Sequence, residues 1–301
     1  MSNGVHIAVM TEEVIEHLRP HANGRYVDAT LGAGTHTEAL LEASAPGGSV
    51  LSLDVDPAAL KRAGERFRAF GGRWKGVEAN FRNIARVARE NGFDHCDGIL
   101  FDLGFSSDEL ADPGKGLSFT VNGPLDMRLG PSANEDGLTA AEIVNGWSRD
   151  ELEEIIRMYG EERYARKIAD AIVRARQHAR LIGTFDLASV IRSAVPRSYE
   201  RGRIHPATRT FQALRIAVND ELNALREAID GARSVLKPGG RIAVISFHSL
   251  EDRIVKQAFR EATDLTRITK KPLVPSQQEI ESNPRSRSAK LRVAERVSSR
   301  T

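Results

Sequence analysis

A short apolar run that ends in an acid constrains this chain more than any other feature. Residues 97–107 read Asp-Gly-Ile-Leu-Phe-Asp-Leu-Gly-Phe-Ser-Ser, so the apolar run stops at Asp102. Continuous apolar runs are typical of strands that are buried on both faces of a parallel sheet. Open α/β folds bind their ligands at the carboxyl ends of such strands. We therefore expect Asp102 to present its carboxylate to a bound ligand.

The first hundred residues alternate strand-like and helix-like stretches. Apolar runs at residues 26–29, 50–53, 77–79 and 98–101 are separated by helical patterns at residues 37–43, 58–70 and 83–91. This spacing predicts right-handed βαβ units and a parallel sheet. Farther along, the patterns predict a long helix at residues 209–236, a strand at 241–247, a loop at 263–283 and a closing antiparallel edge strand at 290–296.

The alternating pattern stops between residues 109 and 205. Turn signals come first, and three helix candidates follow at residues 140–144, 150–159 and 162–177. We predict a core formed by residues 1–108 and 206–301. The inserted residues 109–205 would form a loop and a mainly helical substrate-recognition domain.

The net charge of +2 conceals two basic segments. Residues 157–203 contain 11 Lys and Arg against 5 Asp and Glu, and the C-terminal residues 283–301 contain 6 against 1. Such segments can engage the phosphates of a nucleic acid. The alternative is a solvated helix face and a disordered basic tail.

Cysteine content and hydropathy indicate the compartment. Cys96 is the single cysteine, which excludes an internal disulfide and a multi-cysteine zinc site. No stretch approaches the roughly 20 apolar residues that a membrane-spanning helix needs, and the amino terminus lacks the pattern of a signal peptide. We expect a cytoplasmic protein without membrane partners.

A glycine-rich turn follows the first predicted strand. Residues 28–36 read Asp-Ala-Thr-Leu-Gly-Ala-Gly-Thr-His, and Thr37 stands where a dinucleotide fingerprint has its third glycine. Asp54, at the end of the second strand, can accept hydrogen bonds from a ribose diol. S-adenosylmethionine suits this pattern better than a dinucleotide, because it has an amino group for Asp28 to hold and no pyrophosphate. A tight turn without a ligand is the alternative.

Several separate blocks of the sequence occur in one order: residues 28–34, 97–107, 123–128, 159–162, 205–212, 245–252 and 283–288. Together they resemble one bacterial family, that of ribosomal RNA small subunit methyltransferase H. The resemblance implies a class I (Rossmann-like) S-adenosylmethionine-dependent methyltransferase sheet with an inserted helical domain. It also implies methylation of the N4 amine of cytosine 1402 in the decoding region of 16S rRNA, within the small ribosomal subunit.

The resemblance also implies a set of cofactor contacts, to which the glycine turn adds Gly32. The family usually has glycine at position 35, valine at 105 and glutamine at 109, so Glu109 lacks the amide donor of its counterpart. Phe105 could stack on a base or only fill the space of the valine. The expected cofactor-binding residues are Gly32, Gly34, Thr35, His36, Asp54, Phe81, Asp102 and Glu109.

The expected reaction requires an exocyclic amine to attack a sulfonium methyl group. An acceptor for the amine N–H would turn the nitrogen toward tetrahedral geometry and stabilise the developing positive charge. Asp102 and the carbonyl of Leu103 are the candidates, with Phe105 and His248 beside them. Asp102 could instead hold the cofactor, the role that family analogy favours, and His248 could instead cap a helix. No metal is required.

Three residues outside the sheet are candidates for substrate contact. Asp126 and Arg128 lie in a dense polar loop and could bind a flipped base, because enzymes that modify bases take the target out of its stack. Arg209 could face RNA or form an ion pair. The loop at residues 109–129 is expected to tighten on substrate binding.

Other functions are compatible with the same residues. A methyltransferase for DNA or a small molecule would work on naked substrate, and a cofactor-bound assembly or RNA-binding factor would not need Asp102. A nicotinamide oxidoreductase is disfavoured by the missing third glycine. The sequence leaves the oligomeric state open, a homodimer included, and does not distinguish free rRNA from an assembled subunit as substrate.

Overall fold

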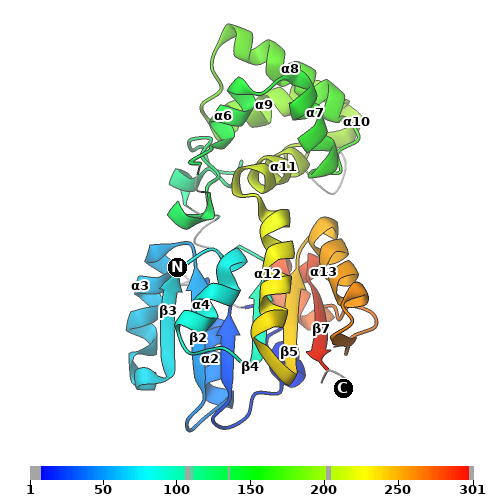
Figure 1. The fold of residues 1–301 in the computed structure, drawn as a ribbon. Helices are drawn as coiled ribbons and strands as arrows, with labels where there is room; N and C mark the ends of the chain where they lie inside the picture. Colours follow the sequence, from blue (N-terminus) through cyan, green and yellow to red (C-terminus); the bar gives the residue numbers. More distant parts are fainter. Residues whose placement is uncertain (1–7, 106–109, 111, 135, 201–204, 298–301) are drawn as a thin grey trace. The chain divides into compact units, whose positions relative to one another are not determined.

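The computed structural model describes residues 8–105, 110, 112–134, 136–200 and 205–297. The chain divides into two compact units. We call residues 1–106 and 222–301 the sheet unit, and residues 107–221 the helical unit (Figure 1). The sequence interpretation ended the insert at residue 205, whereas the compact helical unit extends to Glu221.

The sheet unit is built on seven strands in the order β3-β2-β1-β4-β5-β7-β6. The first five strands run parallel, and β7 pairs antiparallel with both β5 and β6. The predicted α/β fold is confirmed. The predicted antiparallel strand at residues 290–296 is confirmed as β7, but it is not the edge strand, because β6 pairs with its outer side. The strands are β1 (Arg25–Asp28), β2 (Ser49–Asp54), β3 (Trp74–Glu78), β4 (Cys96–Asp102), β5 (Leu236–Ser246), β6 (Leu265–Arg267) and β7 (Lys290–Arg296).

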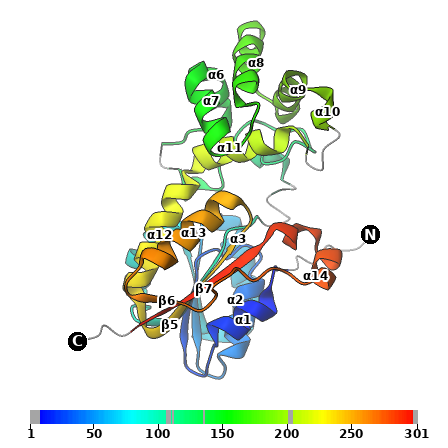
Figure 2. The same cartoon turned by 90° about the vertical axis from the view of Figure 1, so that its right-hand side faces the viewer.

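Helices cover both faces of this sheet (Figures 1 and 2). On one face lie α4 (Ile84–Glu90), α12 (Glu221–Val235) and α13 (Ser249–Glu261), and on the other α1 (Thr11–Leu18), α2 (Thr35–Ala43) and α3 (Pro57–Arg66). The central strand β4 is therefore buried on both sides, and Ile99, Leu100 and Phe101 have no exposed surface. This burial explains why the strand is apolar at consecutive positions. The remaining elements are η1 (Phe67–Arg73), η2 (Phe81–Asn83), α14 (Gln277–Ser282) and η5 (Pro284–Ser288).

Two predictions about the C-terminal half are wrong, and one alternative does not hold. Residues 263–283 contain β6 and α14 instead of an uninterrupted loop. The alternative of a disordered basic tail does not hold for Lys290 and Arg292, because they lie in β7 and both pair with Asp252. The predicted helix at residues 209–236 is two helices, α11 (Ala207–Asn219) and α12, which meet at Asp220 in the left-handed conformation, with φ of 48°.

The break after α11 has a cause in the helical unit. Asn219 is buried, and its side-chain amide donates to the carbonyl oxygen of Met127 at 2.8 Å and accepts from the backbone N–H of Leu129 at 3.0 Å. These hydrogen bonds tie the end of α11 to a loop about ninety residues earlier.

The helical unit packs around a core of its own. Capping boxes begin two of its helices, with Thr139 and Glu142 before α6 and Ser148 and Glu151 before α7. The three predicted helices are present, and two helices that the sequence did not predict, α9 and the short α10, follow them. The elements are η3 (Pro113–Lys115), η4 (Pro131–Ala133), α6 (Ala140–Gly146), α7 (Arg149–Met158), α8 (Ala165–His178), α9 (Thr184–Ala194), α10 (Arg197–Glu200) and α11. Within the described part of the chain, no helix is long and apolar enough to cross a membrane.

Candidate active site

Three carboxylates lie at the carboxyl ends of three neighbouring strands. Asp28 ends β1, Asp54 ends β2 and Asp102 ends β4, and β1 pairs with both of the other strands. The carboxyl ends of parallel strands meet at one edge of the sheet. The fold therefore brings together the acids that the sequence singled out.

The glycine turn approaches this edge through its backbone. Gly32 and Gly34 have φ of 52° and 82°, a region that side chains disfavour. A Cβ atom at Gly34 would lie 2.7 Å from the Phe67 ring, whereas a Cβ atom at Gly32 would meet no heavy atom within 4 Å. The Gly32 N–H donates to Asp54 Oδ2 at 2.8 Å. Gly34 is thus required for packing, and Gly32 leaves space through which a ligand can approach the backbone.

Asp28 holds this turn in place through hydrogen bonds from two threonines. Its side chain is completely buried and accepts hydrogen bonds from Thr37 Oγ1 at 2.7 Å and from the Thr30 N–H at 3.2 Å. Burial raises the pKa of Asp28 to about 6, although the nearby His36 and the Thr37 hydroxyl oppose the shift. Thr37, where the fingerprint has glycine, therefore anchors the start of α2 to the acid. The sequence did not predict a role for Thr37 or Thr30.

Asp102 lies beside a buried histidine. Its backbone N–H donates to Thr30 Oγ1 at 2.7 Å, and its Oδ2 lies 3.3 Å from His36 Nε2. Burial opposes protonation of His36, but the carboxylates of Asp102, Asp28 and Glu279 outweigh it and raise the pKa of His36. The pair thus favours an imidazolium beside a carboxylate.

The second carboxylate oxygen of Asp102 indicates where a ligand would bind. Asp102 Oδ1 is buried and has no hydrogen-bond partner among the described residues. Buried polar atoms in native proteins are almost always hydrogen-bonded, because leaving one unpaired costs about 1–3 kcal/mol. An N–H donor from a bound molecule would satisfy this oxygen.

Phe81, Leu103 and Gly104 also follow the carboxyl ends of strands in the sheet unit. Phe81 follows β3 in η2 and packs edge-on against Phe101, with ring centroids 6.1 Å apart. The Leu103 N–H donates to the carbonyl of Ile245 at 3.1 Å. A Cβ atom at Gly104 would lie 2.7 Å from the Phe247 ring, so the chain after β4 passes close to the end of β5.

Thr35, Phe105 and Glu109 are three further predicted site residues, of which the structure describes the first two. Thr35 is the first residue of α2. Phe105 is partly buried. Glu109 lies outside the described residues.

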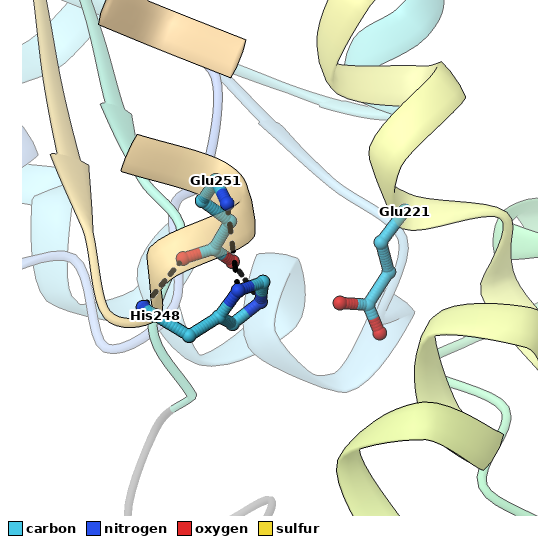
Figure 3. A group of neighbouring side chains, drawn as sticks. All are labelled: Glu221, His248 and Glu251. Atoms are coloured by element: carbon cyan, nitrogen blue, oxygen red, sulfur yellow. Dashed lines mark hydrogen bonds and ion pairs between the residues drawn. The ribbon is translucent and has the colours of Figure 1, made fainter. Parts of the chain in front are cut away.

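His248 caps α13 in the structure. Its Nδ1 accepts from the Glu251 N–H at 3.4 Å, and Glu251 Oε2 accepts from the N–H groups of Phe247 and His248 (Figure 3). His248 Nε2 also lies 3.1 Å from Glu251 Oε1. Of the two roles expected for His248, helix capping is therefore the one that these contacts show.

The candidate substrate residues lie in the helical unit. Arg128 forms a bidentate pair with Asp126, with Nε and Nη2 at 2.8 and 2.7 Å from the two carboxylate oxygens. Arg209 Nη1 donates to the carbonyl of Glu161 at 2.8 Å, whereas Arg215 is paired with Glu221. The structure brings Asp126 and Arg128 together but does not place Arg209 among their hydrogen-bond partners.

The fold and the comparisons with known proteins agree. A seven-stranded sheet in the order 3-2-1-4-5-7-6, with the seventh strand antiparallel, is the class I methyltransferase sheet. The model of the MraW methylase family matches residues 3–297. The chain belongs to the MraW methylase family. The family resemblance predicted from the sequence is confirmed, and with it S-adenosylmethionine as the cofactor.

Individual relatives of this MraW methylase align over nearly their whole length. A ribosomal RNA small subunit methyltransferase H from Synechococcus elongatus is 52% identical over 97% of this chain and 95% of its own. A protein of the same name from Carboxydothermus hydrogenoformans is 49% identical over 97% and 98%. Among solved structures, an rRNA methylase from Streptococcus thermophilus is 13% identical, covers 96% of this chain and 94% of its own, and has a TM-score of 0.44.

The residues at the sheet edge fit the family's cofactor. S-adenosylmethionine carries a sulfonium and an ammonium group, and the edge offers the carboxylates of Asp54 and Asp102. The buried Asp102 Oδ1 could accept a hydrogen bond either from the ammonium of this cofactor or from the amine that receives the methyl group, and the contacts of Asp102 are equally compatible with both. The open space at Gly32 is compatible with close approach of a ligand to the turn.

Proposed function

We propose that this chain methylates the N4 amine of a cytidine in 16S rRNA, cytosine 1402 of the decoding region, within the small ribosomal subunit. The buried and unpartnered Oδ1 of Asp102, at the end of β4 in an MraW methylase sheet, is the observation that supports it most strongly. Small subunits lie in the bacterial cytoplasm, which is where the proposal puts the enzyme.

The cofactor is assigned to the turn and the strand ends. In this proposal Asp54 accepts from the ribose diol, Phe81 covers the adenine face, and the residues from Gly32 to His36 enclose the remainder. Bound S-adenosylmethionine supplies an activated methyl group. Glu109 is assigned to the same site from family resemblance alone.

The chain's own contribution to the reaction is to position and polarise the amine. Asp102 Oδ1 or the carbonyl of Leu103 accepts a hydrogen bond from the N4 amine, whose lone pair is otherwise delocalised into the ring. His36 fixes the orientation of the Asp102 carboxylate through its contact with Oδ2. Phe105 borders the cytosine, and alignment of nitrogen with the methyl group provides most of the remaining rate.

Labelled S-adenosylmethionine and small subunits from a strain lacking this gene test the proposal. The expected product is label in N4-methylcytidine at one position of 16S rRNA, absent when Asp102→Ala replaces the native protein. Deproteinised 16S rRNA and DNA are the control substrates. Label in DNA would instead indicate a DNA methyltransferase, and subunit binding without any label would indicate an assembly factor.

A further inference from the structure

A group of cations and tyrosines gathers at one place in the helical unit. The Arg163 guanidinium lies 4.7 Å from the Tyr164 ring centroid and 5.0 Å from that of Tyr199, and Lys167 Nζ lies 5.7 Å from Tyr164. The two rings meet edge to face at 5.2 Å. The positive charge of Arg209 also acts on Tyr199. We call Arg163, Tyr164, Lys167, Tyr199 and Arg209 the basic–aromatic cluster.

A buried acid holds the rings of this cluster in place. Glu162 is 2% exposed and accepts from the Tyr164 N–H at 2.8 Å and from the Tyr199 hydroxyl at 2.5 Å. Burial and the Glu162 carboxylate raise the pKa of Tyr199 to about 12. Tyr199 therefore stays neutral and does not cancel the neighbouring positive charges.

Residues far apart in sequence are brought together here by a close approach of two segments. A Cβ atom at Gly160 would lie 2.6 Å from the carbonyl oxygen of Arg209. Glycine at this position lets the chain before α8 lie against α11, where Arg209 donates to the Glu161 carbonyl. The sequence blocks at residues 159–162 and 205–212 thus meet in the cluster, although neither belongs to the sheet edge.

Arg163 and Lys167 are distinguished by the tyrosine rings that they lie over. In the part of the chain that the structure describes, no carboxylate lies within ion-pair distance of either side chain, and both are exposed. Arg149, Arg157 and Arg215 each pair with an acid, whereas the exposed Arg166 and Arg174 also have no acidic partner among the described residues but lie over no ring. Cations held over aromatic rings keep their positive charge available to an anionic ligand.

We propose that the basic–aromatic cluster binds the phosphate backbone of the rRNA substrate. The arginine fork suits a phosphate because it can donate two parallel hydrogen bonds, and the tyrosine rings restrict its orientation before RNA arrives. This inference rests on the proposed function, which supplies RNA as the substrate. It adds an anchoring contact in the helical unit to the chemistry at the sheet edge.

Binding of the full-length protein to small subunits and to deproteinised 16S rRNA tests the cluster. The variant Arg163→Gln/Lys167→Gln removes two charges and keeps the side-chain length. We expect its affinity for both RNAs to fall about tenfold near 0.1 M salt, and the slope of log affinity against log salt to shrink by roughly 1.4 to 1.8. Arg157→Gln, which removes an acid-paired charge of the same unit, is the matched control and should leave both quantities unchanged.

One further variant and the outcomes of these measurements distinguish the possible failures. The charge-retaining variant Arg163→Lys/Lys167→Arg should restore the salt slope, which a folding defect would not allow. An unchanged affinity and slope in the Gln variant, or an equal loss in Arg157→Gln, would overturn the cluster as an RNA site. Loss on intact subunits alone would identify a ribosomal protein as the partner and overturn RNA. If the native protein binds RNA through the cluster but makes no N4-methylcytidine, the proposed function fails and the RNA site stands.

Discussion

The two units use charge in opposite ways. At the sheet edge, Asp28 is fully buried and Asp54 and Asp102 are largely covered, and all three are fixed by the glycine turn or by His36. In the basic–aromatic cluster, Arg163 and Lys167 are exposed and lack acidic partners among the described residues. The first arrangement suits one small cation held in one geometry. The second suits a polyanion.

This difference determines how each region should respond to change. A buried charge interacts strongly with its neighbours and is screened little by salt, so a single substitution there should have a large and local effect. Exposed cations act by releasing counterions from RNA, so their effects should be moderate, additive and strongly salt-dependent. Four predictions test the contrast.

The largest effect is expected from Asp102→Asn. The amide keeps the shape of the side chain but loses the negative charge that the proposed reaction places beside the amine, so the single-turnover rate of methyl transfer should fall about 10²- to 10³-fold. Cofactor affinity, measured by calorimetry in parallel, separates the two roles of Asp102. A lower rate at unchanged affinity assigns the carboxylate to the amine, and weaker binding assigns it to the cofactor.

A control on the same strand is available for this substitution. Asp97 lies near the other end of β4, where it pairs with Lys237 and His21. Asp97→Asn should lower stability without changing the rate of the bound enzyme. If Asp102→Asn transferred the methyl group at the native single-turnover rate, the Asp102 carboxylate would have no role in the reaction.

The next largest effect is expected from Asp54→Ala. Loss of hydrogen bonds from a ribose diol to a carboxylate should raise the dissociation constant of S-adenosylmethionine about 10- to 100-fold. Asp56→Ala is the matched control, because Asp56 caps α3 through the Ala58 N–H and lies two residues away. That variant should lose about 1 kcal/mol of stability and keep its cofactor affinity. Equal losses of affinity in both variants would contradict a ribose contact by Asp54.

A smaller effect is expected from Asp126→Asn in the helical unit. The substitution breaks the bidentate pair with Arg128, and an exposed pair of this kind contributes little to stability. If the pair orients a flipped base, KM for the small subunit should rise about threefold to tenfold while cofactor affinity stays constant. Unchanged single-turnover methylation would exclude Asp126 from substrate binding.

The sheet edge could be predicted from sequence because its signals are local. An apolar run ending in Asp102, a glycine turn and an acid after β2 are each contained within a few residues. The role of Thr37 could not be predicted, since it depends on the Asp28 carboxylate buried beneath the turn. His248 was ambiguous for a similar reason, because its cap depends on the ring of His248 turning back to the backbone N–H of Glu251.

Features that depend on distant segments could not be predicted from sequence. The hydrogen bonds that join Asn219, at the end of α11, to a loop about ninety residues earlier have no local signal. The count of basic residues at 157–203 indicated a charged surface but did not identify the residues that form it. Arg163 is distinguished from the other arginines only once Tyr199, 36 residues later, is folded against it.

The smallest effect is a pH dependence of stability at the sheet edge. The pKa of His36 is raised in the folded protein, so the stability that its protonation contributes is fully present below pH 6.5 and is lost as the pH rises through the folded value. Asp28 affects a lower pH range. Because its pKa is raised to about 6, its effect on the free energy of unfolding changes mainly between about pH 4 and 6. As the pH rises above 6.5, the native sheet unit should therefore lose stability that His36→Gln does not lose.

Urea unfolding followed by fluorescence of Trp74 measures this difference. Trp74 packs against Phe67 in the sheet unit, and Trp147→Phe removes the signal of the helical unit from all variants. His95→Gln, at an exposed histidine beside Asp94, should keep the native pH dependence. Asp102→Asn should flatten it as His36→Gln does, because the neighbouring carboxylate is the main source of the raised pKa. If the unfolding free energy of both His36→Gln and Asp102→Asn depended on pH as in the native protein, His36 would not be charged beside Asp102. The sheet edge would then differ from the basic–aromatic cluster only through its buried carboxylates.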